Sequence, residues 1–302
     1  MSNDAPVTDR EERLGWLLVS PALALILLVS LVPIAATTWE AMHRHDLRLP
    51  WLGRTFVGLD NFAEAAADPR FRGALLHTVA FAAVSVPLEI ALGLALAVLM
   101  HKVVRARGLV RATALLPWAI PTVVAGLVWR FMFDAQAGIV TESLRNAGLV
   151  GPSFDWFVHP IAAWVPIVLA DVWKTTPFVA ILLLAGLQAI DPALDEAARM
   201  DGAGTLRRFF TITVPLVAPA LVVAGAFRAL DALRLFDLVY VLTGGGPGTS
   251  TEPLSLYAYI ALTQRLRVGY GSALALSVFL LTLLLARTAV RALGRTVEPE
   301  AR

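Results

Sequence analysis

The sequence predicts an all-α membrane protein with six transmembrane helices. Of its 302 residues, 58% are hydrophobic and only 16% are charged, and the mean hydropathy is +0.71. A soluble domain carries about 25% charged residues, so much of this surface must face something other than water. A helix needs about 20 apolar residues to cross a bilayer, and at these lengths only helices satisfy their own backbone groups in lipid.

Six segments are long and apolar enough to serve as spans. The first is too long for the core of a signal peptide and lacks a convincing cleavage site, so we expect it to be retained. Pro117 and Pro121 predict a distorted third span. The chain should form one domain over 14–302, after a polar tail at 1–13. The expected spans lie at about 14–38, 74–100, 109–133, 161–187, 214–238 and 270–293.

The basic residues favour a cytoplasmic location for both termini. The short loop between spans two and three contains Lys102, Arg105, Arg107 and Arg111 and no acid, and cytoplasmic loops carry an excess of Lys and Arg. If six spans alternate, both termini and the polar loop at 188–213 lie on that same side. The three longer loops then lie outside.

Several functional classes lack the residues that they need. The chain has no Cys, which excludes disulfides and thiolate metal sites, and its five His show no metal-binding spacing. A phosphate-binding P-loop needs a Lys directly after a Gly, but neither Lys102 nor Lys174 follows one. A net charge of +2 without a long basic stripe gives no reason to expect a nucleic-acid partner. We therefore expect no catalytic residue, no metal site and no cofactor bound by this chain.

The polar loop is expected to form two short helices. Asp191 suits the cap of the first helix, Pro192 its first position, and Gly202 the place where it stops. The second helix would contain Arg207, Arg208, Phe209 and Phe210. On spacing alone, such a loop could lie flat on lipid headgroups or could project as a knob into a groove on a soluble partner.

The order of residues in this loop resembles the EAA motif of importer-type ABC permeases. Glu196, Ala197, Ala198, Gly202, Ile212 and Pro215 match its fixed positions, and Val214 stands where Leu is usual. The resemblance implies the type I ABC importer fold and a cytoplasmic loop that docks on an ATP-hydrolysing subunit. Glu196 would make the charged contact, Ala197 and Ala198 would pack in the groove, and Gly202 would permit the bend that follows Asp201.

Further segments resemble the permeases of maltose- and trehalose-type importers, the MalF and SugA group. They include DVWKTTPFVAILLLAGL (171–187), FRALDALRLFDLVYVLTGG (227–245) and YVLTGGGPGTST (240–251). The resemblance implies a bacterial plasma-membrane protein that imports trehalose or a maltose-like disaccharide. It implies a second permease, two ATPase subunits that bind ATP and Mg, and an extracytoplasmic sugar-binding protein or lipoprotein. The turn containing Gly244, Gly245, Gly246 and Pro247 would face that binding protein.

Ionisable residues inside the spans are costly in lipid, and they are candidates for the substrate path. Span four offers Asp171, Trp173, Lys174 and Thr175, an aromatic face with donors and acceptors for sugar hydroxyls. Asp171 and Lys174 lie three apart on the helix, so they could equally neutralise one another. Arg228 and Asp231 are the candidates in span five, and Glu89 in span two is either a structural acid or a path residue.

Two other functions stay open. An ABC permease for glycerol-3-phosphate or a glycerophosphodiester is favoured by Arg228 and Lys174 and opposed by Asp171 and Asp231. A secondary transporter could use Glu89, Asp171 and Asp231 as proton sites. It would be supported by inverted repeats or paired broken helices, and neither is evident in the sequence.

Overall fold

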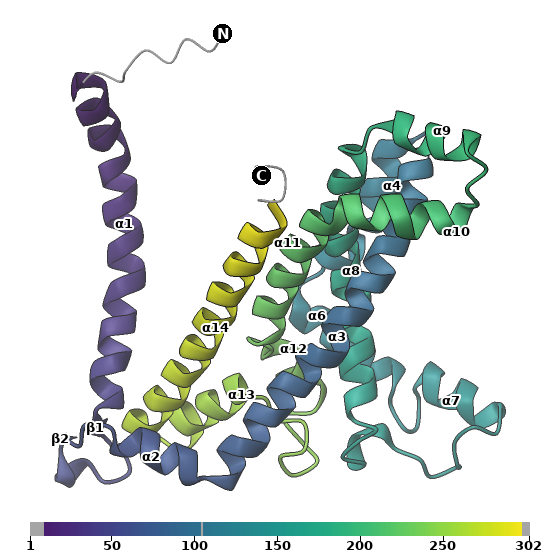
Figure 1. Cartoon of the computed structure of the whole chain (residues 1–302). Helices are drawn as coiled ribbons and strands as arrows, with labels where there is room; N and C mark the ends of the chain where they lie inside the picture. Colours follow the sequence, from purple (N-terminus) through teal and green to yellow (C-terminus); the bar gives the residue numbers. More distant parts are fainter. Residues whose placement is uncertain (1–8, 104, 298–302) are drawn as a thin grey trace.

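The computed structural model describes residues 9–103 and 105–297, and this part of the chain is largely helical (Figure 1). Within it, five helices are long and apolar enough to cross a membrane. The ends of α1 and α14 that carry Asp9 and Val297 lie at the same end of the molecule as the 188–213 loop (Figure 1). The five helices are α1 (Asp9–Ala41), α3 (Pro69–Lys102), α8 (Trp164–Gln188), α11 (Val214–Ala232) and α14 (Val268–Val297). The span that contains α11 starts earlier, with a short helix at Thr205.

The first helix begins earlier than the sequence predicts. Residues 9–13, expected in the polar tail, already belong to α1, and residues 1–8 of that tail lie outside the described residues. The predicted spans two, four and six correspond to α3, α8 and α14. Pro177 lies inside α8, and the helix continues through it.

The third predicted span is not one helix. The chain forms α4 (Arg107–Ala114), α5 (Leu116–Ala119) and α6 (Thr122–Met132) in its place. Pro117 lies in the first turn of α5 and Pro121 directly precedes α6. Proline lacks the backbone N–H that a continuous helix needs and clashes with the preceding turn, so the predicted distortion becomes two breaks.

The fifth span also ends sooner than predicted. It starts from α10 (Thr205–Arg208), passes through a five-residue π-helical segment (Phe209–Thr213) and continues as α11, which stops at Ala232. A short turn follows, and α12 (Asp237–Leu242) begins there. Residues 233–236, expected inside the membrane helix, therefore form a break, and residues 237 and 238 already belong to α12.

The end opposite to the 188–213 loop is built from short elements. An antiparallel hairpin pairs β1 (His43–Arg44) with β2 (Thr55–Phe56), with His43 opposite Phe56. The other elements at this end are a 3₁₀ turn (Pro50–Leu52), α2 (Asp60–Ala67), α7 (Ile139–Asn146), a 3₁₀ turn (Trp156–Val158), α13 (Leu254–Tyr259) and a π segment (Ile260–Gln264).

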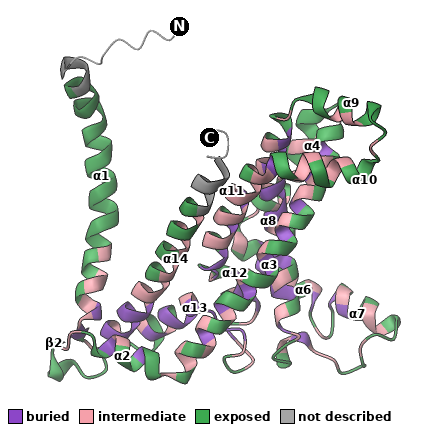
Figure 2. Cartoon of the chain, in the orientation of Figure 1, coloured by how far each residue is buried: buried purple, intermediate pink, exposed green. Residues whose placement is uncertain are grey.

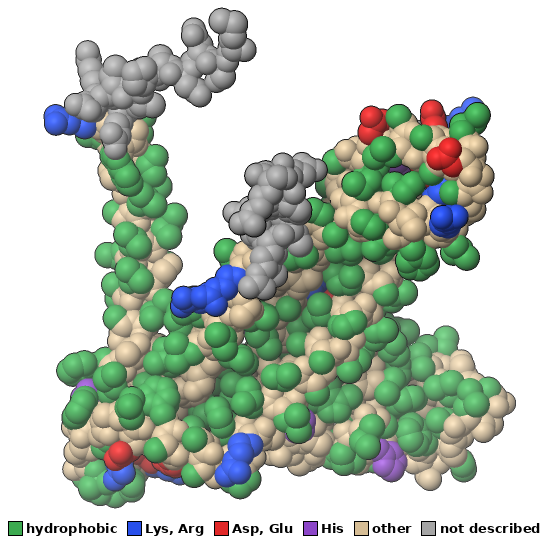
Figure 3. All heavy atoms as spheres, in the orientation of Figure 1, with side chains coloured by type: hydrophobic (Ala, Val, Ile, Leu, Met, Phe, Trp, Pro, Cys, Tyr) green, Lys and Arg blue, Asp and Glu red, His purple; other side chains and the backbone are tan. Residues whose placement is uncertain are grey.

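One buried cluster lies where α3, α8 and α11 pack together, a second around α8 and α12, and a third where α2, α13 and the start of α14 meet (Figure 2). Gly93 of α3 shows how close the first two helices come, because a Cβ at this position would lie 2.5 Å from Val179 Cγ1 of α8. Outside these clusters, hydrophobic side chains cover most of the helices between charged groups at the two ends (Figure 3). That pattern suits a protein whose middle faces lipid.

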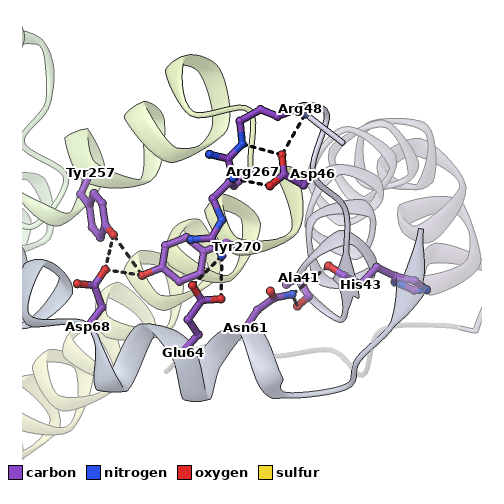
Figure 4. A network of polar contacts seen from close by, with 10 residues as sticks. All are labelled: Ala41, His43, Asp46, Arg48, Asn61, Glu64, Asp68, Tyr257, Arg267 and Tyr270. Atoms are coloured by element: carbon purple, nitrogen blue, oxygen red, sulfur yellow. Dashed lines mark hydrogen bonds and ion pairs between the residues drawn. The ribbon is translucent and has the colours of Figure 1, made fainter. Parts of the chain in front are cut away.

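The first helix stands apart from the bundle along most of its length (Figures 1 and 2). No residue of its most apolar stretch is buried within the chain. It is anchored near Ala41, whose carbonyl accepts a hydrogen bond from Asn61 Nδ2 at 2.8 Å (Figure 4). Just beyond this end of the helix, Gly269 N of α14 donates to His45 O at 3.1 Å.

A clamp of polar side chains fixes this anchoring region to α13 and α14 (Figure 4). Asp68 Oδ2 accepts from the hydroxyls of Tyr257 and Tyr270, at 2.5 and 2.8 Å. Arg267 donates to both carboxylate oxygens of Glu64, at 2.7 and 2.8 Å. The clamp joins segments that are about 200 residues apart in the chain, so this end of the molecule is held as one unit.

Candidate functional site

The 188–213 loop folds as its sequence predicts. The first helix, α9, spans Pro192–Met200, and the Asp191 side chain accepts from the Ala193 amide at 2.9 Å. Gly202 has φ +75°, a conformation that is costly for a residue with a Cβ. The Ala203 amide donates to Ala198 O at 2.9 Å and closes the helix end. The predicted cap, first position and stop are therefore confirmed.

Ion pairs brace the two helices of the loop against each other. Asp195 of α9 pairs with Arg208 of α10 at 2.8 Å and with Arg199 one turn along its own helix at 2.8 Å. Arg208 is thus engaged within the protein rather than free for lipid headgroups. Met200 and Leu206 are exposed apolar side chains at the tip of the loop, as a surface that docks on another protein would require.

The predicted coupling residues are mostly accessible. Glu196, Ala197, Asp201 and Gly202 are exposed, and Ala198 is half-buried. Glu196 also lines a hollow of about 530 Å³, together with residues of the last turn of α3. The roles implied for these residues stay predictions.

A second hollow, of about 350 Å³, lies where α8, α11 and α12 meet the broken third span. Three carboxylates and two cations are among its lining residues, beside two aromatic rings and two threonines. We call it the central hollow. Its lining is Trp118, Thr122, Asp171, Lys174, Thr175, Asp231, Ala232, Arg234, Leu235, Phe236, Asp237 and Leu238.

Behind the central hollow, a single guanidinium joins three helices. Arg228 of α11 is buried, and its Nη2 donates to Asp171 Oδ2 of α8 at 2.9 Å and to Glu89 Oε1 of α3 at 2.8 Å. Its Nε donates to the second Glu89 oxygen, and its Nη1 donates to Asp231 Oδ2 at 2.5 Å. A buried charge is tolerated only when its partners satisfy it, and Arg228 has three carboxylates around it. We call these four residues the ion cluster.

The structure brings together most of the residues predicted for the substrate path. Asp171, Lys174, Thr175 and Asp231 line the central hollow, and Arg228 lies behind two of them. Their contact with substrate stays a prediction. The sequence did not single out Trp118 of α5, which also lines the hollow; its place beside Pro117, in the predicted distortion, was the available signal.

Two expectations about span four need correction or qualification. Asp171 and Lys174 do not pair with each other: Asp171 pairs with Arg228, and Lys174 Nζ donates to the Trp118 carbonyl at 3.2 Å. Trp173 does not line the central hollow; its ring lies 5.9 Å from that of Trp129, and the residue is 40% exposed. A substrate contact for Trp173 remains a prediction, made from a different face of α8.

The glycine-rich turn after α12 is held firmly from within. Gly244 and Gly245 have φ +63° and +92°, and Thr251 Oγ1 donates to Gly246 O at 2.7 Å. Gly244 is exposed, whereas Gly245 is buried and Gly246 and Pro247 are half-buried. Of the predicted contact residues, Gly244 is therefore the most accessible.

The turn is also fixed to the start of α3. Arg70 donates to both oxygens of the buried Glu252 carboxylate at 2.7 Å, and Trp164 Nε1 donates to Ser250 O at 3.0 Å. These contacts to the starts of α3 and α8 fix the orientation of the exposed part of the turn.

Comparison with known proteins agrees with this architecture. Residues 89–298 match the model of the family described as "Binding-protein-dependent transport system inner membrane component". The chain is 43% identical to the trehalose/maltose transport system permease protein MalF of Thermococcus litoralis, over 91% of each chain. It is 39% identical to the trehalose transport system permease protein SugA of Mycobacterium tuberculosis, over 89% of this chain and 85% of that one.

Among solved structures, a chain of a bacterial ABC transporter involved in the import of the acidic polysaccharide alginate superposes with a TM-score of 0.80. The match covers 96% of this chain and 98% of that one at 21% identity, so it shows a shared fold. The predicted all-α fold of a type I ABC importer transmembrane domain is confirmed, and so is the resemblance to the MalF and SugA group. The chain belongs to the family of inner-membrane permease components of binding-protein-dependent ABC importers.

Proposed function

We propose that this permease carries a neutral sugar, trehalose or a maltose-like disaccharide, and forms half of the translocation path. The central hollow is the observation that carries the proposal. Its volume of about 350 Å³ falls within the range of small-molecule sites, about 300–1,000 Å³. Trp118 and Phe236 offer ring surfaces, and Asp231, Lys174 and Thr175 offer acceptors and donors for hydroxyl groups. Relatives named for trehalose and maltose transport support the same substrate class.

The energy for transport comes, in this proposal, from two cytoplasmic ATPase subunits that bind ATP and Mg. The 188–213 loop docks on one of them, through Glu196, Ala197 and the exposed tip at Met200. The loop is joined to α11 without a break, because α10, the π segment and α11 follow one another directly. Movement of the loop is thereby transmitted towards Arg228, on the same helical run.

A second permease subunit completes the path, and an extracytoplasmic sugar-binding protein or lipoprotein delivers the sugar at the Gly244–Pro247 turn. Both termini and the 188–213 loop lie in the cytoplasm of a bacterium, and the hairpin, α7 and the glycine-rich turn lie outside. The Asp9 end of α1, the Val297 end of α14 and the 188–213 loop all lie at the same end of the molecule (Figure 1). This arrangement supports the proposed topology.

The test is to purify this chain with its native partners under mild extraction and to measure ATP hydrolysis across a panel of solutes. We expect an ATPase subunit to co-purify and hydrolysis to rise with trehalose or a maltose-like sugar in the presence of the binding protein. The panel includes glycerol-3-phosphate and a glycerophosphodiester as anionic alternatives.

Each result decides between functions. Stimulation by glycerol-3-phosphate alone would replace the sugar by that solute. Uptake that persists without ATP and collapses with the proton gradient would indicate a secondary transporter. Cross-linking from an Ala197→Cys variant adds a check on the loop, because a product with lipid and none with the ATPase would contradict docking.

A further inference from the structure

Glu89 is a buried acid that does not reach the central hollow. It lies in the middle of α3 with its side chain fully enclosed, and it is absent from the residues that line the hollow. Both of its carboxylate oxygens accept from Arg228, one from Nε and one from Nη2. A paired-oxygen contact of this kind fixes the plane of a guanidinium as well as its position.

The orientation of Arg228 in turn decides where two other carboxylates lie. Its Nη2 holds Asp171 and its Nη1 holds Asp231, and these two residues do line the hollow. The Asp231 side chain is 71% exposed although it pairs with Arg228, so it faces both the cluster and the hollow. Glu89 lies behind this lining, and its printed hydrogen bonds reach Asp171 and Asp231 by way of Arg228.

Asp171 and Asp231 give the ion cluster a share in the charge of the hollow, whose lining also contains Asp237 and the cations Lys174 and Arg234. The donor groups Nε, Nη1 and Nη2 of Arg228 all point at carboxylates of the cluster. Three acids surround one guanidinium, so the cluster offers hydrogen-bond acceptors and an excess of negative charge. On the side of the hollow that Asp171 and Asp231 line, these acceptors favour solutes that donate through hydroxyl groups and disfavour carboxylates, phosphates and sulfonates.

We propose that Glu89 is a positioning residue: it orients Arg228, which holds Asp171 and Asp231 at the wall of the hollow as acceptors for the hydroxyl groups of a neutral sugar. The inference rests on the proposed function for the identity of the sugar. The role of Glu89 rests on the geometry of the cluster alone.

The test measures the dissociation constant of trehalose by equilibrium dialysis for the purified complex of this chain with its second permease and ATPase subunits. The variants are Glu89→Gln, Asp231→Asn and the double variant. Glu89→Gln keeps the shape of the side chain and removes its charge. We expect each single variant to weaken binding by about tenfold, the size of one lost charge-assisted hydrogen bond. The double variant should bind no more weakly than the weaker single variant, because both changes act through the same contact.

Ser85→Ala is the matched control. Ser85 is also fully buried, on the same helix and one turn from Glu89, but it is not part of the ion cluster. Its dissociation constant should stay within twofold of the parent chain. If Glu89→Gln does not assemble with the partner subunits, Arg228→Lys replaces it; this variant keeps the positive charge, loses the two-pronged geometry and should weaken binding to the same extent.

The outcomes separate the two proposals. The positioning role would be overturned if Glu89→Gln, or the variant that replaces it, bound trehalose as tightly as the parent chain. It would also be overturned if the effects of Glu89→Gln and Asp231→Asn multiplied in the double variant. If the parent complex bound an anionic solute and no neutral sugar, the proposed function would be overturned, and so would the role of Asp171 and Asp231 as acceptors for sugar hydroxyl groups. The same variants tested with that solute would then still decide whether Glu89 orients the cluster.

Discussion

Gly202 adopts a backbone conformation that favours glycine over every residue with a Cβ. Its φ of +75° belongs to the left-handed region, which costs a residue with a Cβ about 1–2 kcal/mol. No atom lies within 4 Å of the place where a Cβ would stand, so a substitution there changes the backbone preference without creating a clash. We expect Gly202→Val to lower sugar-stimulated ATP hydrolysis at least tenfold while the chain still inserts into the membrane.

The matched control for this prediction is Gly204→Val. Gly204 lies two residues further along, also has open space at the Cβ position, and adopts φ −65°, which every residue tolerates. Equal loss of coupling in both variants would show that any bulk at the loop is harmful. Normal uptake by Gly202→Val would refute the bend as part of the coupling surface.

At the residue scale, the sequence correctly predicted the ends of a helix, which depend on neighbouring residues. It did not predict ion pairs between residues that are far apart in the chain. Asp191, Pro192 and Gly202 act on backbone groups within a few residues, so their types and spacing are sufficient to predict the helix and its ends. Glu89 and Arg228 are 139 residues apart, and nothing in their own neighbourhoods indicates the other. Pairing of Asp171 with Lys174 on its own helix was one of two alternatives that the sequence left open, and in the structure Asp171 pairs with Arg228 instead.

At the scale of the element, Asp68 combines two functions at the start of α3. Its side chain caps the helix by accepting from the Arg70 amide at 2.8 Å, and it also accepts from the Tyr257 and Tyr270 hydroxyls. Partial burial opposes its ionisation, but these hydrogen bonds outweigh that effect and leave the pKa of Asp68 below its usual value. The ionised form therefore stabilises the fold.

We expect Asp68→Ala to lower the unfolding temperature of the purified complex, with about 1 kcal/mol lost from the helix cap alone. The contribution of Asp68 is fully present above the ordinary pKa of an aspartate, 3.8, and it is lost as the pH falls through the lower pKa of the folded state. The parent protein should therefore lose thermal stability as the pH is lowered below about 4, and the variant should lose less.

Melting curves from pH 7 to pH 3 measure both effects. Asp60→Ala, at the exposed start of the neighbouring α2, serves as the control for removing an exposed acid. Parallel pH profiles for the parent protein and Asp68→Ala would show that the clamp does not depend on the charge of Asp68.

The boundaries of elements were the part of the fold that hydrophobicity could not define. Leu233, Leu235 and Phe236 are as apolar as the residues of α11, so the pattern extended span five to 238, although α11 ends at Ala232. The breaks on either side of α5 were missed for the same reason: two prolines predicted a distortion there but did not indicate its extent. Both errors fall at the central hollow, because non-helical backbone at membrane depth is tolerated where it lines a cavity.

At the scale of the whole molecule, α1 is the element that this chain leaves uncovered. Its most apolar stretch has a high hydropathy and no buried residue, and its contacts to the rest of the chain lie at the anchoring region near Ala41. In the assembled importer, we expect one side of α1 to pack against the second permease and the other side to face lipid. A helix with two such environments shows a 3.6-residue period in accessibility.

The chain has no native Cys, so single cysteines placed in turn at positions 23–30 each provide the only thiol. Spin labels at these positions report their accessibility to oxygen dissolved in the lipid phase. The assembled complex should show a periodic pattern over the two turns, with protected positions three or four residues apart, because one face of the helix is covered. The isolated chain, reconstituted in the same lipid, is the control and should show uniformly high accessibility, since none of these side chains is buried by the chain itself. A uniform profile in the complex would mean that lipid surrounds α1 on all sides and that the second permease packs elsewhere.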